Sequence, residues 1–203
     1  MSGARRRMAA EERRTQLLDA CAAIVDVEGF GAVTIDRVAR ACAVTRPVVY
    51  QHFGGLDGLL DALVERAAGR AAAAIAGAPR RRGRSSLRDV MADVLAAADA
   101  DPATWRMFLV APRAGPPALA ASLAWGRALI RERNAAEIAH RSGGAVADPE
   151  LAARMLQVIA DELVRLRLED PSAYPVDRLL AQLDTVAAAL LPTATPTGRR
   201  PGP

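Results

Sequence analysis

The most informative stretch of the sequence is residues 34–53, TIDRVARACAVTRPVVYQHF. Two short helices are predicted here, because Thr34 and Thr45 are good N-cap residues and Pro47 falls in a first turn, where a missing N–H costs nothing. A tight turn at 43–44 separates the two helices. Four residues are spaced to form one small apolar core: Val38, Ala39, Val44 and Val49. This pattern predicts a helix-turn-helix, whose second helix can lie in the major groove of DNA.

Helical periodicity continues along nearly the whole chain, and strand patterns are almost absent. A first helix is predicted to end at Gly29, and a fourth to run over about 56–75. Later helices are predicted to begin after N-cap or proline residues at Ser86, Asp101, Pro116 and Asp148. The last two helices are expected over about 149–168 and 175–191. The chain is therefore predicted to be all-α, with about nine helices, an arginine-rich linker at 77–85 and a disordered tail at 192–203.

Composition narrows the class of protein. The 203 residues carry a net charge of +4, and all 27 basic residues are arginines, a balance that permits DNA binding without demanding it. No uncharged stretch is long enough to span a membrane, so no membrane contact is expected. The arginines at 5–7 are not followed by an apolar segment, which argues against a secretory signal and for the cytoplasm.

The spacings needed for common metal and catalytic sites are missing. A structural zinc site needs four Cys and His ligands in close pairs, whereas Cys21 and Cys42, the two cysteines of the chain, lie far apart. Cys21 and Cys42 are expected to be buried thiols, a redox role being the alternative. Glu137 and His140 form a single Glu-x-x-His pair, whereas a di-iron bundle needs two pairs and two further Glu. Neither a nucleophile elbow nor a phosphate-binding glycine loop occurs, so we predict no enzyme, cofactor or metal.

Further motifs surround the helix-turn-helix. They are Gly29-Phe30, Thr34, Val38-Ala39, Val44-Thr45, Tyr50-Gln51-His52-Phe53 and Leu59-Leu60. Over residues 13–64 the chain thereby resembles the TetR family of bacterial transcriptional regulators, which are similar to the tetracycline repressor. The resemblance implies a homodimeric, ligand-responsive regulator, by default a repressor, that binds a palindromic operator on double-stranded DNA through the helix at 45–53. It also implies a DNA-binding domain at 1–55 and a regulatory and dimerisation domain at 56–191.

The resemblance assigns DNA contacts residue by residue. Base and nearby sugar-phosphate contacts fall to Thr45, Arg46, Pro47 and Val48. Arg46 can make a bidentate pair with guanine. Tyr50 and His52 match phosphate-binding positions, Gln51 either a base or the backbone, and Thr34 a phosphate at a helix N-terminus.

Two positions depart from the family pattern. Ala43 stands in the turn where the family usually has Gly at positive φ, which costs about 1 kcal/mol. Leu56 stands where the family usually has a phosphate-binding Lys, and its effect on DNA affinity is open. The arginines at 5–7 are a candidate replacement contact, the alternative being a plain disordered N-terminus.

The last two helices are predicted to associate with a second subunit. A coiled-coil-like seam consists of Leu179, Leu183, Val186 and Leu190. The preceding helix is apolar on more than one side, as expected of a helix with both a core and a partner. A thick core within one chain is the alternative.

The resemblance also implies a ligand pocket around Trp105, Arg106, Phe108 and Trp125, for a largely apolar effector, and apolar walls with a few polar groups suit such a pocket. Ordinary core packing explains the same residues as well. The alternative function is a helical small-molecule sensor or adaptor without specific DNA binding. The operator, the regulated genes, the effector and the direction of its effect are not encoded in any pattern of the sequence.

Overall fold

The structure, a computed structural model, describes residues 10–77, 86–109 and 115–191. Within these ranges it contains nine α-helices, one short 3-10 helix and no strand, which confirms the predicted all-α fold. The elements are α1 (Ala10–Glu28), η1 (Phe30–Ala32), α2 (Ile35–Ala41), α3 (Arg46–Phe53), α4 (Leu56–Gly77), α5 (Leu87–Ala100), α6 (Pro102–Leu109), α7 (Pro117–Ser142), α8 (Pro149–Glu169) and α9 (Val176–Leu190). Arginines 5–7, nearly all of the predicted linker and the predicted tail lie outside the described residues.

The chain divides into two compact units. The first comprises residues 1–78 and 97–123, and the second comprises residues 79–96 and 124–203. The predicted domain boundary at 55–56 stays a prediction. Among the helices described, none is both long and apolar enough to cross a bilayer. The same part of the chain holds no group of His, Cys, Asp and Glu arranged to bind a metal ion.

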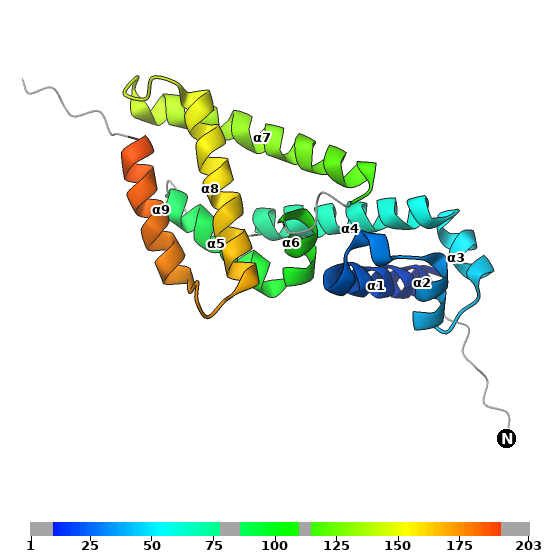
Figure 1. The fold of residues 1–203 in the computed structure, drawn as a ribbon. Helices are drawn as coiled ribbons and strands as arrows, with labels where there is room; N and C mark the ends of the chain where they lie inside the picture. The colour runs from blue at the N-terminus through cyan, green and yellow to red at the C-terminus, as the bar shows by residue number, and fades with distance from the viewer. Residues whose placement is uncertain (1–9, 78–85, 110–114, 192–203) are drawn as a thin grey trace, which may run out of the picture. The chain divides into compact units, whose positions relative to one another are not determined.

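In the first unit, α1, α2 and α3 pack together and against the beginning of α4 (Figure 1). The predicted apolar positions of all four helices meet at the centre. Side chains that are at most 4% exposed form this core: Leu17, Cys21, Val25, Val38, Val49, Leu59 and Leu63. Each buried Leu or Val of this kind stabilises the fold by roughly 1.5–3 kcal/mol. Both α2 and α3 are too short to persist alone, so this core is what holds them as helices.

Side chains cap several helix starts as predicted. Thr34 and Asp148 each accept a hydrogen bond from the backbone N–H three residues on, at 3.2 and 3.0 Å. Asp101 does the same at 3.3 Å. Ser86 and Asp89 cap reciprocally, each side chain accepting from the other residue's N–H, at 3.1 and 3.0 Å. These bonds satisfy N–H groups that a helix itself leaves unpaired.

The turn between α2 and α3 has a strained residue. The N–H of Val44 donates to the Ala39 carbonyl at 2.9 Å and closes the turn. Ala43 has a φ of 52° and is the only non-glycine residue of the described ranges with a positive φ. The positive φ expected at this position is thus confirmed. Thr45 is the N-cap residue of α3, but its side chain makes no capping bond, so a hydroxyl cap there is a wrong prediction.

Replacing Ala43 by glycine is expected to stabilise the protein. The Cβ of a residue in the left-handed region clashes with its own backbone, and Ala43 is exposed, so Ala43→Gly removes the clash and no packing. We expect the free energy of unfolding to rise by about 1 kcal/mol and Tm by about 3 °C, measured by thermal unfolding. Ala72→Gly, at an exposed helical position, should lower it by about 1 kcal/mol. If both variants lost the same free energy of unfolding, Ala43 would not be strained.

In the second unit, α8 and α9 run antiparallel beside each other (Figure 1). Their apolar residues alternate with charged ones at helical spacing, so each helix presents one apolar face to the other. The buried side chains of the pair are Leu156, Leu163, Val164, Leu168, Leu179, Leu180 and Leu183. A neighbouring cluster joins Ile138 of α7 to Ala152 and Ala153 of α8.

Candidate nucleic-acid interface

The N-terminal edge of α3 is open to solvent. Thr45, Arg46 and Pro47 are exposed and Val48 is half-buried, whereas Val49 is fully buried in the core. The helix is therefore anchored through one face, while the opposite face and its first turn remain accessible. This is the arrangement that lets a second helix of a helix-turn-helix enter a DNA groove.

Arg46 is oriented by a residue of α2. Its Nε and Nη2 donate to the two carboxylate oxygens of Asp36. The Arg46 side chain nevertheless remains 64% exposed. No sequence pattern pointed to Asp36, because the only trace of the pair is two opposite charges ten positions apart on different helices. The turn between α2 and α3 is what brings them together.

The C-terminal half of α3 is attached to α1. Nη1 of Arg14 donates to the His52 carbonyl at 3.3 Å, and its guanidinium carbon lies 4.6 Å from the centre of the Phe53 ring. Tyr50 is 52% exposed, Gln51 is exposed and His52 is half-buried. Tyr50 and Gln51 thus lie on the outer surface of a helix that is held from behind.

Thr34 lies at the start of α2, exposed, with its hydroxyl oxygen accepting the Arg37 N–H. A hydroxyl keeps its own hydrogen for donation, so this cap leaves Thr34 able to donate to a phosphate. Leu56, in place of the family's Lys, is half-buried at the start of α4. The structure thus brings Thr45, Arg46, Pro47 and Val48 together on one turn; the DNA contacts assigned to them stay predictions.

The beginning of α4 lies directly against the end of α3. A Cβ placed on Gly58 would overlap the backbone carbonyl oxygen of Phe53. Only glycine permits this approach without displacing the backbone of one helix. The position of α3 therefore depends on the absence of a side chain at residue 58, a requirement that no sequence pattern announced.

Ion pairs attach α1 to the two helices behind it. Nη1 of Arg66 on α4 lies 2.7 Å from Oδ1 of Asp19, and Nη1 of Arg106 on α6 lies 3.0 Å from Oδ1 of Asp26. Both acids belong to α1. Through these pairs and the Arg14 contacts, α1 is attached to α4, α6 and α3.

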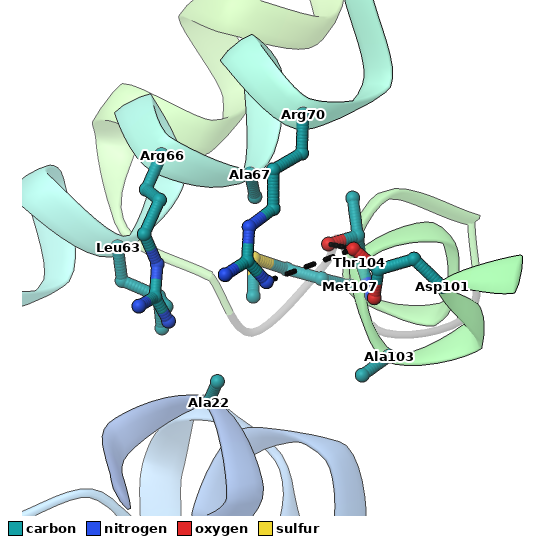
Figure 2. Close-up of a pocket in the computed structure, with 9 residues that line it drawn as sticks. All are labelled: Ala22, Leu63, Arg66, Ala67, Arg70, Asp101, Ala103, Thr104 and Met107. Carbon is teal, nitrogen blue, oxygen red and sulfur yellow. Dashed lines mark hydrogen bonds and ion pairs between the residues drawn. The ribbon is translucent and has the colours of Figure 1, made fainter. Parts of the chain in front are cut away.

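A small cavity lies among α1, α4 and α6 (Figure 2). Figure 2 shows the Arg70 guanidinium directed toward Asp101, whose carboxylate also accepts from the Thr104 hydroxyl at 2.8 Å. Nη1 of Arg70 lies 3.7 Å from Oδ2 of Asp101. The cavity volume of about 30 Å³ suits one or two water molecules. It is far below the ~300 Å³ of an ordinary small-molecule site.

The four residues predicted to line a ligand pocket do not surround this cavity. Trp105 is half-buried and Phe108 is buried, while Arg106 is engaged with Asp26. Trp125 is 72% exposed and belongs to the second unit. Their role as pocket residues stays a prediction.

A larger groove of about 330 Å³ lies between α7 and α8. Its lining is mostly charged and consists of Arg127, Arg131, Arg154, Gln157, Val158, Asp161, Glu162 and Arg165. Burial raises the pKa of the Asp161 carboxyl, and the Arg127 guanidinium, 2.9 Å away, offsets only part of that rise. Such a lining differs from the largely apolar pocket that the sequence predicted.

Part of the predicted dimer seam lies inside the chain. Leu179 and Leu183 are only 3% and 2% exposed, and Val186 and Leu190 are half-buried. This is the intrachain packing that stood as the alternative, and contact of the seam with a second subunit stays a prediction. The exposed large apolar residues of the second unit are Val90 on α5, three residues of α7 and three of α8: Trp125, Leu129, Ile130, Leu151, Met155 and Val158.

Comparison with known proteins finds similar sequences for part of the first unit. Residues 17–63 match the model of the family described as bacterial regulatory proteins, tetR family. The transcriptional regulator SrpR of Pseudomonas putida is 41% identical over 46 residues, 23% of this chain and 22% of SrpR. The regulator BetI 2 of Chromohalobacter salexigens is 42% identical over 48 residues, 24% of this chain and 23% of BetI 2. The matches thus span less than a quarter of either relative.

Solved structures extend the likeness in fold to most of the chain. A TetR-like transcriptional regulator from Rhodococcus sp. RHA1 superposes with a TM-score of 0.74 at 23% identity, covering 89% of this chain and 96% of that one. SmeT, solved as a complex with triclosan, gives a TM-score of 0.66 at 21% identity, covering 94% and 97%. The likeness to these structures is in fold. The segment that matches the tetR family model, residues 17–63, is the one that contains the helix-turn-helix.

Proposed function

We propose that the chain is a dimeric transcriptional repressor that places α3 of each subunit in one half-site of a palindromic operator. The observation that carries the proposal is the exposed first turn of α3, with Arg46 available above a buried core. A bidentate arginine–guanine pair discriminates against wrong bases by roughly 1–3 kcal/mol. Pro47 and Val48, next in the same turn, offer apolar surface to a thymine methyl.

The exposed face of α8 supports the dimer. Leu151, Met155 and Val158 are 48%, 44% and 65% exposed and lie on one stripe of the helix. Large apolar side chains gathered in this way mark an interaction surface. Because two-fold interfaces use the same surface of both subunits, we propose that two α8 helices cross antiparallel near Val158.

Charges along α8 fit this crossing. In an antiparallel pair centred on Val158, a residue four positions before the centre faces the partner's residue four positions after it. Arg154 then faces the partner subunit's Glu162, and two-fold symmetry repeats this pair, so the dimer contains it twice. Arg165, seven positions after the centre, brings its aliphatic stem over the partner subunit's Leu151. Opposite charges at both ends favour the antiparallel register.

Control by a small-molecule effector is the second part of the proposal. The effector would be largely apolar, and α6 would carry its effect, because α6 is joined to α1 through Arg106 and Asp26. Since α1 in turn holds α3 through Arg14, a shift of α6 would move the DNA-binding helix. Such a shift requires an effector that binds the two arrangements with different affinity.

Selection of the purified protein against random duplex DNA tests the DNA-binding proposal. We expect a palindromic consensus from the wild type. Arg46→Ala should lose the preference for one guanine per half-site, by about tenfold to a hundredfold in relative affinity, and keep the other preferences. Arg133→Ala removes the same charge from an exposed position on α7 and should leave the consensus unchanged.

Two results would speak against this function. Weak, salt-sensitive binding without a consensus would favour a helical sensor or adaptor that lacks a specific operator. A consensus that Arg46→Ala leaves intact would keep DNA binding but remove Arg46 from the interface. A titration of Arg46→Ala with salt distinguishes a lost base contact from a lost phosphate contact. Loss of a base contact does not change the number of counterions released on binding.

A further inference from the structure

An acidic residue of α2 holds the arginine that the proposed function places on DNA. Asp36 lies in the first turn of α2, and Arg46 is the first residue of α3, so their ion pair spans the turn between the two helices. We infer that Asp36 is a positioning residue that directs Arg46 and thereby sets the base preference of α3, an inference that rests on the function proposed above.

Arg46 has enough donors for Asp36 and a base together. A guanidinium group carries five N–H donors. The pair with Asp36 uses Nε and one hydrogen of Nη2, and it occupies both carboxylate oxygens. The outer edge, formed by Nη1 and the second hydrogen of Nη2, faces away from the carboxylate. That edge is the one that can donate to O6 and N7 of guanine while the inner edge stays paired.

The pair is built for specificity more than for stability. The side chains of Arg46 and Asp36 are 64% and 46% exposed, and exposed ion pairs contribute little to folding. Fixing a long side chain before DNA arrives reduces the entropy lost on binding a guanine. A carboxylate close to the groove also repels phosphates, which weakens binding in wrong registers. Both effects raise the ratio of operator affinity to non-specific affinity.

A neighbouring ion pair supplies a control. Arg37, next to Asp36, donates to the Glu28 carboxylate and to the Ala32 carbonyl, each at 3.0 Å. Glu28 and Arg37 therefore form another exposed ion pair of the same unit, which involves no residue of α3. Glu28→Gln removes one negative charge and one ion pair, as Asp36→Asn does, without touching Arg46.

The test compares binding to the selected operator and to a scrambled duplex over a range of salt concentrations. Asp36→Asn should tighten binding to the scrambled duplex and lower the operator-to-scrambled affinity ratio by about tenfold. Guanine preference at the Arg46 position should weaken, as in Arg46→Ala. Glu28→Gln should change both affinities together and keep the ratio. In the Arg46→Ala background, Asp36→Asn should have no further effect on base preference, because the residue it positions is gone. Thermal unfolding checks that each variant is folded.

The outcomes separate this inference from the function on which it rests. A wild-type protein without a consensus overturns both. A wild-type consensus with equal affinity ratios in Asp36→Asn and Glu28→Gln overturns the role of Asp36 alone. That role is also overturned if Asp36→Asn lowers the ratio equally with and without Arg46, because the carboxylate would then act on DNA only through its charge.

Discussion

Gly58→Ala is expected to lower the free energy of unfolding by about 3 kcal/mol, the upper end of the range for overpacked positions. The added methyl group would overlap the carbonyl oxygen of Phe53. A flexible side chain could move aside, but this oxygen belongs to the last residue of α3, so the backbone of α3 or α4 must shift. Tm should fall by about 6–12 °C in a thermal unfolding experiment.

A second glycine of α4 provides a matched control. Gly69 is exposed, and a Cβ at that position would meet no atom within 4 Å. Gly69→Ala should therefore stabilise the helix by about 1 kcal/mol, as alanine does in an exposed helix interior. The same substitution in one helix is thus expected to lower the free energy of unfolding at position 58 and to raise it at position 69. Equal stabilisation at both would mean that α3 and α4 do not approach as closely as the structure shows.

Gly58→Ala is expected to weaken operator binding as well as the stability of the fold. A shifted α3 no longer presents Arg46 at the angle that the helix-turn-helix requires, so Gly58→Ala should bind the operator weakly even well below its Tm. Fluorescence anisotropy with a labelled operator measures this loss. Full operator affinity in a destabilised Gly58→Ala protein would show that the α3–α4 contact serves folding only.

Val158→Asp is expected to convert the dimer to a monomer. In the isolated chain Val158 is 65% exposed, so the substitution should leave the folded subunit intact. In the proposed interface the two copies of residue 158 face each other, and two carboxylates would be desolvated side by side. An uncompensated buried charge costs about 3–5 kcal/mol, which raises the dimer dissociation constant by at least about 100-fold.

Sedimentation equilibrium over a range of concentrations measures the effect. Val27→Asp is the matched control, because Val27 is 80% exposed on α1, in the other unit. That variant should remain as dimeric as the wild type. If Val158→Asp also remained dimeric while the wild type dimerised, the α8 crossing would be wrong and the α9 seam would be the next surface to test. Loss of the dimer should also abolish cooperative binding to two half-sites.

The helix-turn-helix could be predicted from the sequence because its determinants are local. Thr34 at a cap, Pro47 in a first turn and buried residues at helical spacing act within a few positions of each other. The positive φ of Ala43 was predictable for the same reason, since the turn between two short helices dictates it. By contrast, the missing hydroxyl cap at Thr45 depends on a side-chain rotamer, which the residue type alone does not determine.

The α9 seam shows where periodicity stops being informative. A heptad-like row predicts an apolar face but not the helix it packs against. Leu179 and Leu183 pack inside their own chain, and Leu151, Met155 and Val158 of α8 stay exposed. The same hydrophobic burial would stabilise either partner, so the choice is made by the turn between α8 and α9, which puts them side by side.

By itself the sequence determined the all-α fold, the helix-turn-helix and its resemblance to the tetR family, because caps, turns and apolar spacing act over short distances along the chain. Only the tertiary structure decided three features. Asp36 pairs with Arg46, the Phe53 carbonyl oxygen lies where a side chain at residue 58 would be, and α8 keeps an apolar face exposed to solvent. Each of these depends on two helices meeting at a particular angle. That angle results from packing of the whole core, which no single stretch of sequence contains.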